Sequence, residues 1–350
     1  MRRRGRAKTG YRQDIALIAN QKQWLAWVTS VLLLAILPLI LNATGNRTWV
    51  TFINFTFLTV IAVLGLNVIT GMSGQISLGH SAFIMVGGYT MAVFTAQMGW
   101  NFWLALLLSV VITGITGLLV ATPAIRLKGF YVAVVTLAFF TIAQFILKSL
   151  DITGGIFGLI GVSYPTIAGL QFRTDTSWYY LLFMFTILSA IVSANISRSR
   201  YGRAFLAVRD NDVTTSSLGI NVPFTKLHAF FIGSLFAGLA GGFWASYVSV
   251  IRLDQFTIWD SIWYIGMIII GGAGSTAGTI MGVIFLRLLS QILHVIGSSN
   301  LTTLSSSDSI YLTYGIFGLI IILFVSFQPH GLISLWFKLK ANYKRWPFGI

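Results

Sequence analysis

The stretch Ser197–Lys226 reads SRSRYGRAFLAVRDNDVTTSSLGINVPFTK and interrupts an otherwise apolar chain. Charged residues are scarce in this protein, which has 23 Lys and Arg and 8 Asp and Glu among 350 residues. Those in the stretch are Arg198, Arg200, Arg203, Arg209, Asp210, Asp212 and Lys226. Long apolar segments flank it on both sides. A basic, polar element between membrane spans is expected on the cytoplasmic side, where it offers a surface to a soluble partner.

The composition indicates an integral membrane protein. Hydrophobic residues make up 56% of the chain and charged residues 9%, whereas a soluble domain has about 25% charged residues. The net charge of +15 does not indicate nucleic-acid binding, because the basic residues cluster where the positive-inside rule places them. The clusters at the two ends are Arg2, Arg3, Arg4, Arg6, Lys8, Arg12 and Lys22, and Lys338, Lys340, Lys344 and Arg345.

The apolar segments predict an all-α fold with about ten membrane spans, each needing roughly 20 mainly apolar residues. Two regions are irregular. Ser77–Met98 opens with a Gly- and Ser-rich approach, and Ile258–Leu293 contains the run GGAGSTAG, which predicts a short segment, a turn and a second span from Thr276. The regular spans are Trp24–Leu41, Val50–Thr70, Phe102–Thr122, Phe130–Leu150, Trp178–Ile196, Leu227–Val250 and Ile310–Phe327.

An even number of spans places both termini on the cytoplasmic side. Residues 1–23 and 337–350 are then basic cytoplasmic tails, and residues 24–336 form the transmembrane domain with a cytoplasmic loop at 197–226. Division at the external loop Asp151–Ser177 gives two sets of five spans, so the second set must be inverted relative to the first. Each half has a glycine-rich interruption, at Gly71–Gly79 and at Gly271–Gly278.

The polar loop contains signals for a short isolated helix. Asn211 or Asp212 can cap it, Gly219 occupies the position of a left-handed residue that ends it, and Pro223 suits the first turn of the next helix. From these signals alone, a solvated loop that is merely helical is at least as good an interpretation as a docking element.

Several segments resemble the permeases of ATP-binding-cassette importers for branched-chain amino acids. The resemblance extends from about Val50 to Trp336, with the segments in the family's order and spacing. The segments that carry it are GLNVITGMSGQISLGHSAFIMVGGYTMA (65–92), Arg209–Gly219 with the following INV, AFFIGSLFAGLAGGFWA (229–245), GGAGSTAGTIMG (271–282) and QPHGLISLW (328–336).

In that family the cytoplasmic loop holds a coupling helix that docks on the ATPase. The resemblance therefore implies a docking role for Arg203, Arg209, Asp212, Thr214, Thr215 and Gly219. Family members usually have Glu and two Ala where this chain has Asp212, Thr214 and Thr215. The implied partners are a second homologous permease, two ATPase subunits that bind ATP and Mg²⁺, a periplasmic or surface solute-binding protein, and membrane lipid. The implied location is the cytoplasmic (inner) membrane of a bacterium or archaeon.

Small and hydroxylated residues in the two interruptions predict the translocation path, because they allow close helix approach and irregular backbone along a cavity. For His80, a hydrogen bond to a neighbouring helix is the more economical interpretation, and substrate contact or proton relay is the alternative. The candidate path residues are Gly71, Gly74, Ser77, Gly79, His80, Ser81, Gly271, Gly272 and Ser275.

The remaining charges in or near the spans have ordinary explanations beside functional ones. Lys148 and Asp151, three residues apart, are expected to pair or to reach the outer interface. Arg287 is the deepest charge, about 16 Å from the inner turn, and is either functional or reaches the interface. Three further charges near the outer face form a solvated rim or contact a solute-binding protein: Arg252, Asp254 and Asp260.

Motifs of catalysis are missing from the sequence, which contains no GxxxxGK[ST], H-E-x-x-H or GxSxG. The chain is therefore expected to be a transport subunit without catalytic residues, bound cofactor or metal. The resemblance implies branched-chain or other neutral amino acids as substrates, with urea or short amides as alternatives. An ion-coupled carrier would need acidic residues at mid-membrane, and the Asp residues lie near interfaces or in loops. A scaffold without transport would not explain the paired glycine interruptions.

Overall fold

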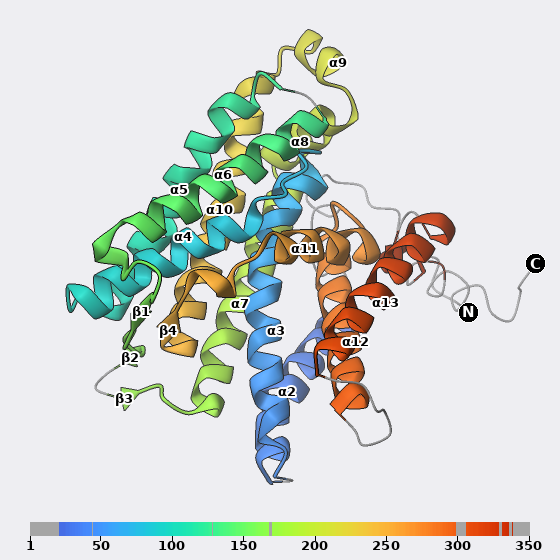
Figure 1. Cartoon of the computed structure of the whole chain (residues 1–350). Helices are drawn as coiled ribbons and strands as arrows, with labels where there is room; N and C mark the ends of the chain where they lie inside the picture. The colour runs from blue at the N-terminus through green and yellow to red at the C-terminus, as the bar shows by residue number, and fades with distance from the viewer. Residues whose placement is uncertain are drawn as a thin grey trace, which may run out of the picture.

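The computed structural model describes residues 21–43, 45–127, 129–167, 170–298, 306–328, 331–335 and 338, so most of both predicted tails lies outside the described residues. The described chain is almost wholly helical (Figure 1). The α-helices are α2 (Gln21–Ala43), α3 (Arg47–Leu66), α4 (His80–Ala92), α5 (Phe102–Ala124), α6 (Phe130–Ser149), α7 (Asp175–Arg198), α8 (Arg200–Asp210), α9 (Asp212–Ser217), α10 (Val222–Val248), α11 (Ile258–Gly271), α12 (Thr276–Ser298) and α13 (Ser306–Phe327). Two π-helical segments, η1 (Asn67–Met72) and η2 (Val93–Gln97), extend α3 and α4, and two 3₁₀ turns are η3 (Asp151–Thr153) and η4 (Leu253–Gln255).

Six of the described helices are long and apolar enough to cross a membrane. The other four predicted spans fall on α2, α4, α11 and α13 but do not meet that standard within the described residues, so a count of ten is not established. For α4 and α11 the reason is the glycine-rich interruptions, which leave helices of 13 and 14 residues, about 20 Å long. The six spans are Arg47–Met72, Phe102–Pro123, Phe130–Ser149, Asp175–Arg198, Val222–Val248 and Thr276–Leu293.

The region Ile258–Leu293 divides as the sequence predicts. Helix α11 ends at Gly271, and α12 begins at Thr276 after a turn in which Gly272 and Gly274 adopt positive φ. A side chain at Gly271 would overlap the backbone oxygen of Gly278, so the two helices meet closely at this turn.

Two short antiparallel ribbons are the exception to the all-α prediction. Strand β1 (Leu159–Ile160) pairs with β4 (Val250–Ile251), and β2 (Thr166–Ile167) pairs with β3 (Leu170–Gln171). The first ribbon joins the segment after α6 to the segment between α10 and α11. Each strand has two residues, so the ribbons fasten loops and add no sheet layer.

Helix α10 lies at the centre of the fold and packs along α3, α4 and α5. Its glycines permit this contact: Gly233 meets Gly65 of α3, Gly238 meets Gly87 of α4, and a Cβ at Gly241 would overlap the carbonyl oxygen of Ile84. Such small-residue contacts replace hydrophobic burial as the basis of helix association in a membrane. Gly238 and Gly242, four residues apart, also approach α5, at Ser109 and Leu106.

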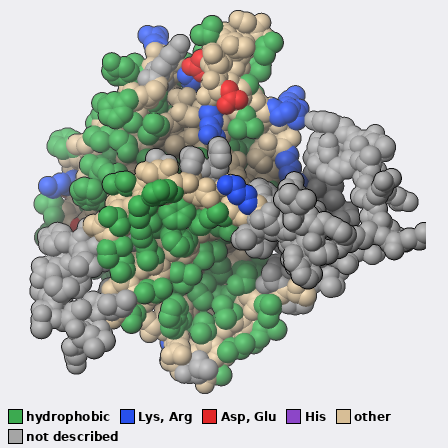
Figure 2. Space-filling model, turned by 90° about the vertical axis from the view of Figure 1, so that its right-hand side faces the viewer, with side chains coloured by type: hydrophobic (Ala, Val, Ile, Leu, Met, Phe, Trp, Pro, Cys, Tyr) green, Lys and Arg blue, Asp and Glu red, His purple; other side chains and the backbone are tan. Residues whose placement is uncertain are grey.

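The molecule has two distinct ends. At one end η1, α8 and the Gly272–Gly274 turn meet through Arg209 and Gly71. At the other, Asp175 of α7 accepts hydrogen bonds from Thr51 of α3 (3.0 Å) and Tyr247 of α10 (2.9 Å). Lys, Arg and Asp side chains gather at the upper end, above a broad hydrophobic area (Figure 2).

Candidate functional site

The polar loop between α7 and α10 folds into α8 and α9, and each expected cap is present. Asn211 Oδ1 accepts hydrogen bonds from the N–H groups of Val213 (2.9 Å) and Thr214 (3.2 Å) and so caps α9. Gly219 ends that helix with φ +81°, a value that favours glycine. Asn221 then caps α10, whose first turn contains the predicted proline. The sequence signals in this loop are confirmed.

Helix α9 is fastened to the rest of the protein by inward-facing polar groups. Asp212 Oδ2 lies 2.7 Å from Lys226 Nζ, in α10, and the Lys226 side chain is only 4% exposed. The hydroxyl of Thr215, which is buried, donates to the carbonyl oxygens of Ala207 and Asn211, both at 2.7 Å. Asp212 and Thr215 therefore position the helix. Because Thr215 is buried, its side chain does not form part of the surface of α9 that a partner could contact.

The outward face of α9 is apolar at its tip. Val213 is 65% exposed and Leu218 is 74% exposed, and Thr214 and Gly219 are exposed beside them. In Figure 1, α9 protrudes at the top of the molecule. Sequence reasoning missed Val213 and Leu218, although two apolar residues in a polar loop were a signal that could have identified them. Arg203, also exposed, donates through Nη1 to the Arg198 carbonyl oxygen (3.2 Å).

The link between α9 and α10 leads to a prediction. In Asp212→Ala the buried Lys226 ammonium loses its counter-ion, and breaking such a pair costs about 3–5 kcal/mol. We expect amide hydrogen exchange in α9 to accelerate roughly tenfold or more, measured by mass spectrometry. Adding Lys226→Met removes the stranded charge and should restore slow exchange. Asp210→Ala, at an exposed neighbouring carboxylate, is the matched control; a double variant that exchanges as fast as Asp212→Ala would contradict the prediction.

The two glycine-rich interruptions meet in space beneath this loop. Asn67 Oδ1, in η1, accepts a hydrogen bond from the Gly274 N–H (2.9 Å). Arg209 Nη1, in α8, donates to the Gly71 carbonyl oxygen, and the Arg209 side chain packs against Gly74. A side chain at Gly71 would overlap Asn67 Oδ1 and crowd Gly274. We call this contact of η1, α8 and the Gly272–Gly274 turn the glycine junction.

Sequence reasoning treated the two interruptions separately and did not select Asn67. An amide inside the apolar run GLNVITG was the available signal, because polar groups in spans usually bond to another helix. Phe205 of α8 is also buried at this end, against Val68, Met72 and Ala229. The loop thus packs against the glycine junction through both polar and apolar contacts.

The other candidates of the first interruption lie between α3, α6 and α11. A Cβ at Gly79 would overlap the Thr136 carbonyl oxygen of α6. His80 Nε2 lies 2.8 Å from the Ala62 carbonyl oxygen, which confirms the expected hydrogen bond to a neighbouring helix. Ser81 Oγ lies 2.9 Å from Ser261 Oγ, at the start of α11. Ser77 is fully buried.

The candidates of the second interruption shape the turn between α11 and α12. Gly272 has φ +117°, and the Ser275 hydroxyl accepts a hydrogen bond from the Gly278 N–H (3.2 Å) at the start of α12. Gly271 permits the close approach of the two helices. Gly271, Gly272 and Ser275 therefore shape the turn that places Gly274 at the glycine junction.

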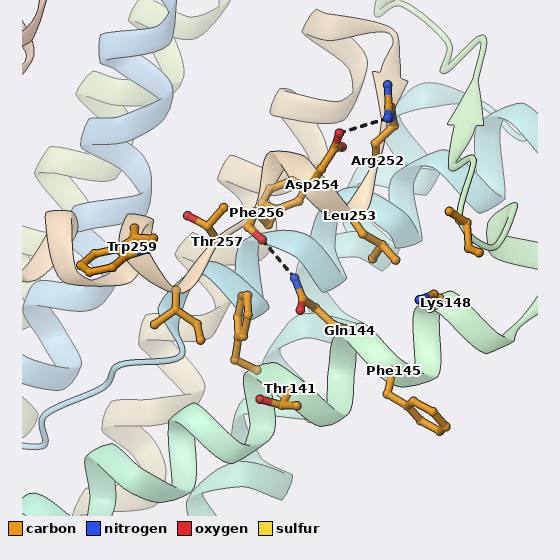
Figure 3. A pocket seen from close by; sticks show the side chains of 13 residues that line it. Thr141, Gln144, Phe145, Lys148, Arg252, Leu253, Asp254, Phe256, Thr257 and Trp259 are labelled. Atoms are coloured by element: carbon orange, nitrogen blue, oxygen red, sulfur yellow. Dashed lines mark hydrogen bonds and ion pairs between the residues drawn. The ribbon is translucent and has the colours of Figure 1, made fainter. Parts of the chain in front are cut away.

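A cavity of about 650 Å³ lies at the opposite end, between α6 and the segment from β4 into α11 (Figure 3). Lys148 of α6, Arg252 and Asp254 line it. Arg252 Nη2 is 3.1 Å from Asp254 Oδ2. Gln144 Nε2 of α6 donates to the Phe256 carbonyl oxygen (3.1 Å), which holds the segment against the helix. None of the candidate path residues lines this cavity.

Of the two expectations for Lys148, pairing with Asp151 is absent among the described residues, and the side chain is exposed at the end of α6, in keeping with the alternative. Helix α6 ends at Ser149, and Leu150 is extended, so the two residues do not share a helix. Lys148 forms no ion pair with any residue that the structure describes. It lines the cavity instead.

Arg287 lies in α12 with its guanidinium 5.6 Å from the ring centroid of Phe52. Phe52 is five residues into α3, about 8 Å from that helix's first residue. The arginine therefore extends toward the first turns of α3, and its Nε is buried there without a hydrogen-bond partner among the described residues. In the described part of the chain, no three His, Cys, Asp or Glu side chains form a possible metal site.

A family profile described as "Branched-chain amino acid transport system / permease component" matches residues 48–325. The chain belongs to this family. The permease is 29% identical to the high-affinity branched-chain amino acid transport system permease protein LivM of Escherichia coli and 28% identical to LivM of Salmonella typhimurium; each match spans 83% of this chain and 71% of the relative. It is 27% identical to the autoinducer 2 import system permease protein LsrC of Salmonella paratyphi B over 39% of this chain and 38% of the relative. No solved structure matches the chain significantly.

Membership of this family fixes the general role of the chain. It is a multi-pass membrane protein of an ATP-binding-cassette transport system, a transport subunit rather than an enzyme, and it binds no cofactor itself. The resemblance inferred from the segments between Val50 and Trp336 is confirmed by the profile, which covers nearly the same range.

Proposed function

We propose that this chain is the permease subunit of an ATP-driven importer and forms part of the translocation path for branched-chain or other neutral amino acids. Separate ATPase subunits drive it. The observation that carries the proposal is α9, which protrudes from the protein with apolar Val213 and Leu218 at its tip. An ATPase groove that receives this tip is the partner such a surface fits.

The contacts of the loop supply a route for the ATPase motion. Lys226 joins α9 to α10, the central helix, through Asp212. Arg209 joins α8 to Gly71 at the glycine junction, where Asn67 holds Gly274. A displacement of α9 would therefore move α10 and both interruptions together. In this proposal Arg203, Thr214 and Gly219 belong to the docking region, and Thr215 positions it.

A second, homologous permease completes the pore in this proposal. Helix α6 supports it, because Val134, Ala138, Thr141 and Phe145 form an exposed stripe at spacings of four, three and four residues. Small and hydroxylated residues on an outward face of a membrane helix favour association with another helix. Two ATPase subunits and a solute-binding protein would complete the complex in a bacterial or archaeal cytoplasmic membrane.

We further propose ten membrane crossings arranged as two inverted halves, with residues 24–336 as the permease domain and both tails cytoplasmic. The glycine junction supports this arrangement, because it brings together the interruptions at Gly71–Gly79 and Gly271–Gly278. In transporters built from inverted repeats, broken helices of the two halves meet at the substrate path. Of the candidate path residues, Gly71, Gly74, Gly271, Gly272 and Ser275 lie on or beside this contact, whereas Ser81 lies at the start of α11.

Reconstitution tests the proposed function. The complete complex in vesicles should take up L-leucine only when ATP, the ATPase subunits and the binding protein are all present. Omission of any one should reduce uptake at least tenfold. Uptake by this chain alone, driven by a proton or sodium gradient, would contradict the proposal in favour of an ion-coupled carrier, and uptake of urea or short amides with no amino acid uptake would replace the substrate.

A further inference from the structure

The cavity of Figure 3 combines charged and apolar groups. It contains two cationic side chains and one carboxylate beside apolar walls. We propose that it is the mouth of the translocation path at the end opposite α9, and that it binds a zwitterionic amino acid with an apolar side chain. This inference rests on the proposed function and assigns a binding site to its substrate.

The position of the cavity fits a mouth. Helix α10 (Val222–Val248) contacts α9 at Lys226 and leads to the β1–β4 ribbon after Val248, a distance of about 33 Å along the helix from Lys226. The cavity lies beside that ribbon, at Ile156 and Arg252. It is thus separated from the coupling loop by the full thickness of a bilayer. Its volume falls within the 300–1,000 Å³ typical of small-molecule sites.

The cationic groups suit a carboxylate. Lys148 has no ion-pair partner among the described residues, although it lies at the end of a membrane span. Arg252 uses Nη2 for Asp254 and has further guanidinium donors, because the group has five N–H bonds. A carboxylate between these two side chains would give Lys148 the partner that the permease itself does not provide.

The single carboxylate suits an ammonium group. Asp254 engages Arg252 through Oδ2, and a carboxylate has about four acceptor positions on its two oxygens. An α-ammonium can therefore bind Asp254 without displacing Arg252. The Arg252–Asp254 pair then offers both charges side by side, with Arg252 Nη2 and Asp254 Oδ2 3.1 Å apart.

The apolar part of the lining suits an aliphatic side chain. Phe140 from α6 and Leu253 and Ile258 from the facing segment line the same space. The bond from Gln144 to Phe256 fixes the segment against α6, so these walls keep their separation. Urea, short amides and sugar-like solutes carry neither charge, so they would leave the charged groups of this cavity without partners.

A second source can supply the same chemistry. Phosphatidylethanolamine carries an anionic phosphate and an ammonium next to apolar chains, and Phe145 and Trp259 at the cavity are exposed to surroundings that include lipid. The amino acid is favoured because Thr141 of this cavity belongs to the exposed stripe of α6, where the second permease is proposed to bind. The second permease, and not lipid, would then face the cavity. The experiment distinguishes the two.

Since the chain has no cysteine, Thr141→Cys places a unique thiol on this chain. The Thr141 hydroxyl bonds to its own helix, at Leu137, so the change breaks no described hydrogen bond to another helix of this chain. The complete complex is reconstituted in phosphatidylcholine and phosphatidylglycerol vesicles, and a small charged methanethiosulfonate modifies it. Mass spectrometry of this chain gives the rate.

L-Leucine at millimolar concentration should slow modification of Thr141→Cys at least threefold. Isopentylamine and 4-methylpentanoate, which each lack one of the two charges, should not. Adding Lys148→Gln or Asp254→Asn should abolish the protection, whereas Asp151→Asn, a carboxylate outside the cavity, should preserve it. Gln171→Cys, exposed and away from the cavity, should react at one rate with or without leucine.

If L-leucine does not change the modification rate of Thr141→Cys in vesicles that still accumulate L-leucine, the cavity assignment is wrong and the proposed function stands. Protection that follows the phosphatidylethanolamine content of the vesicles instead of leucine would also overturn the cavity assignment, in favour of a lipid site. A complete complex that takes up no amino acid would overturn the proposed function and this inference together.

Discussion

Gly241→Val is expected to prevent the permease from folding to a stable, monodisperse protein while leaving its insertion into the membrane intact. A Cβ at Gly241 would overlap the Ile84 carbonyl oxygen and lie 2.8 Å from the Gly88 nitrogen. Both are backbone atoms of α4, so no side-chain rotation relieves the overlap, and α10 must move away from α4. Overpacking costs about 3 kcal/mol at the upper end of its usual range, and this contact lies at the centre of the fold.

Fluorescence-detected size-exclusion chromatography measures the result as the monodisperse fraction after detergent extraction, which should fall roughly tenfold or more. Gly318→Val is the matched control, because no atom lies within 4 Å of a Cβ at Gly318 in α13. It makes the same chemical change in another α-helix of this chain. Equal loss in both variants would show that β-branching alone, and not the contact of α10 with α4, sets the stability.

The elements that the sequence predicted correctly are those decided by local chemistry. Asn211 and Gly219 bound α9 because a side-chain acceptor and a left-handed residue act within one helical turn. The turn between Gly271 and Thr276 likewise follows from a run of residues that cannot continue a helix. The six described spans follow from apolar length alone.

The contacts that the sequence could not predict join distant positions. Arg209 and Gly71 are 138 residues apart, and Asn67 and Gly274 are 207 apart. No period or cap relates such pairs, because their proximity depends on how α10 packs against α3 and α4. The absence of a Lys148–Asp151 pair has a local cause, since the helix ends between the two residues.

The orientation of α9 was also beyond the sequence. A helix of six residues is too short for periodicity to show which face is buried. The resemblance directed attention to Asp212, Thr214 and Thr215, whereas the structure turns Thr215 inward and Val213 outward. The apolar tip formed by Val213 and Leu218 is therefore a result of the fold.

Leu218→Asp is expected to release the ATPase subunits while leaving the permease folded. Leu218 is 74% exposed and forms the end of the protruding loop, so its replacement removes no contact within this chain's core. Loss of a buried leucine from an interface costs about 2 kcal/mol, or roughly thirtyfold in affinity. The added carboxylate would also be desolvated in an apolar groove. Co-purification of the ATPase and ATP-dependent uptake should both fall, with the chromatographic profile of the permease unchanged.

Ser217→Asp is the matched control, because it adds the same charge to an exposed neighbour without removing an apolar side chain. We expect it to retain most of the association. If Ser217→Asp and Leu218→Asp release the ATPase equally, charge and not apolar contact governs docking, and the role assigned to the α9 tip is wrong. If neither does so, the partner contacts another face of the loop, where Arg203 and Thr214 are exposed. Together the two variants thus show whether the Leu218 side chain itself makes the docking contact.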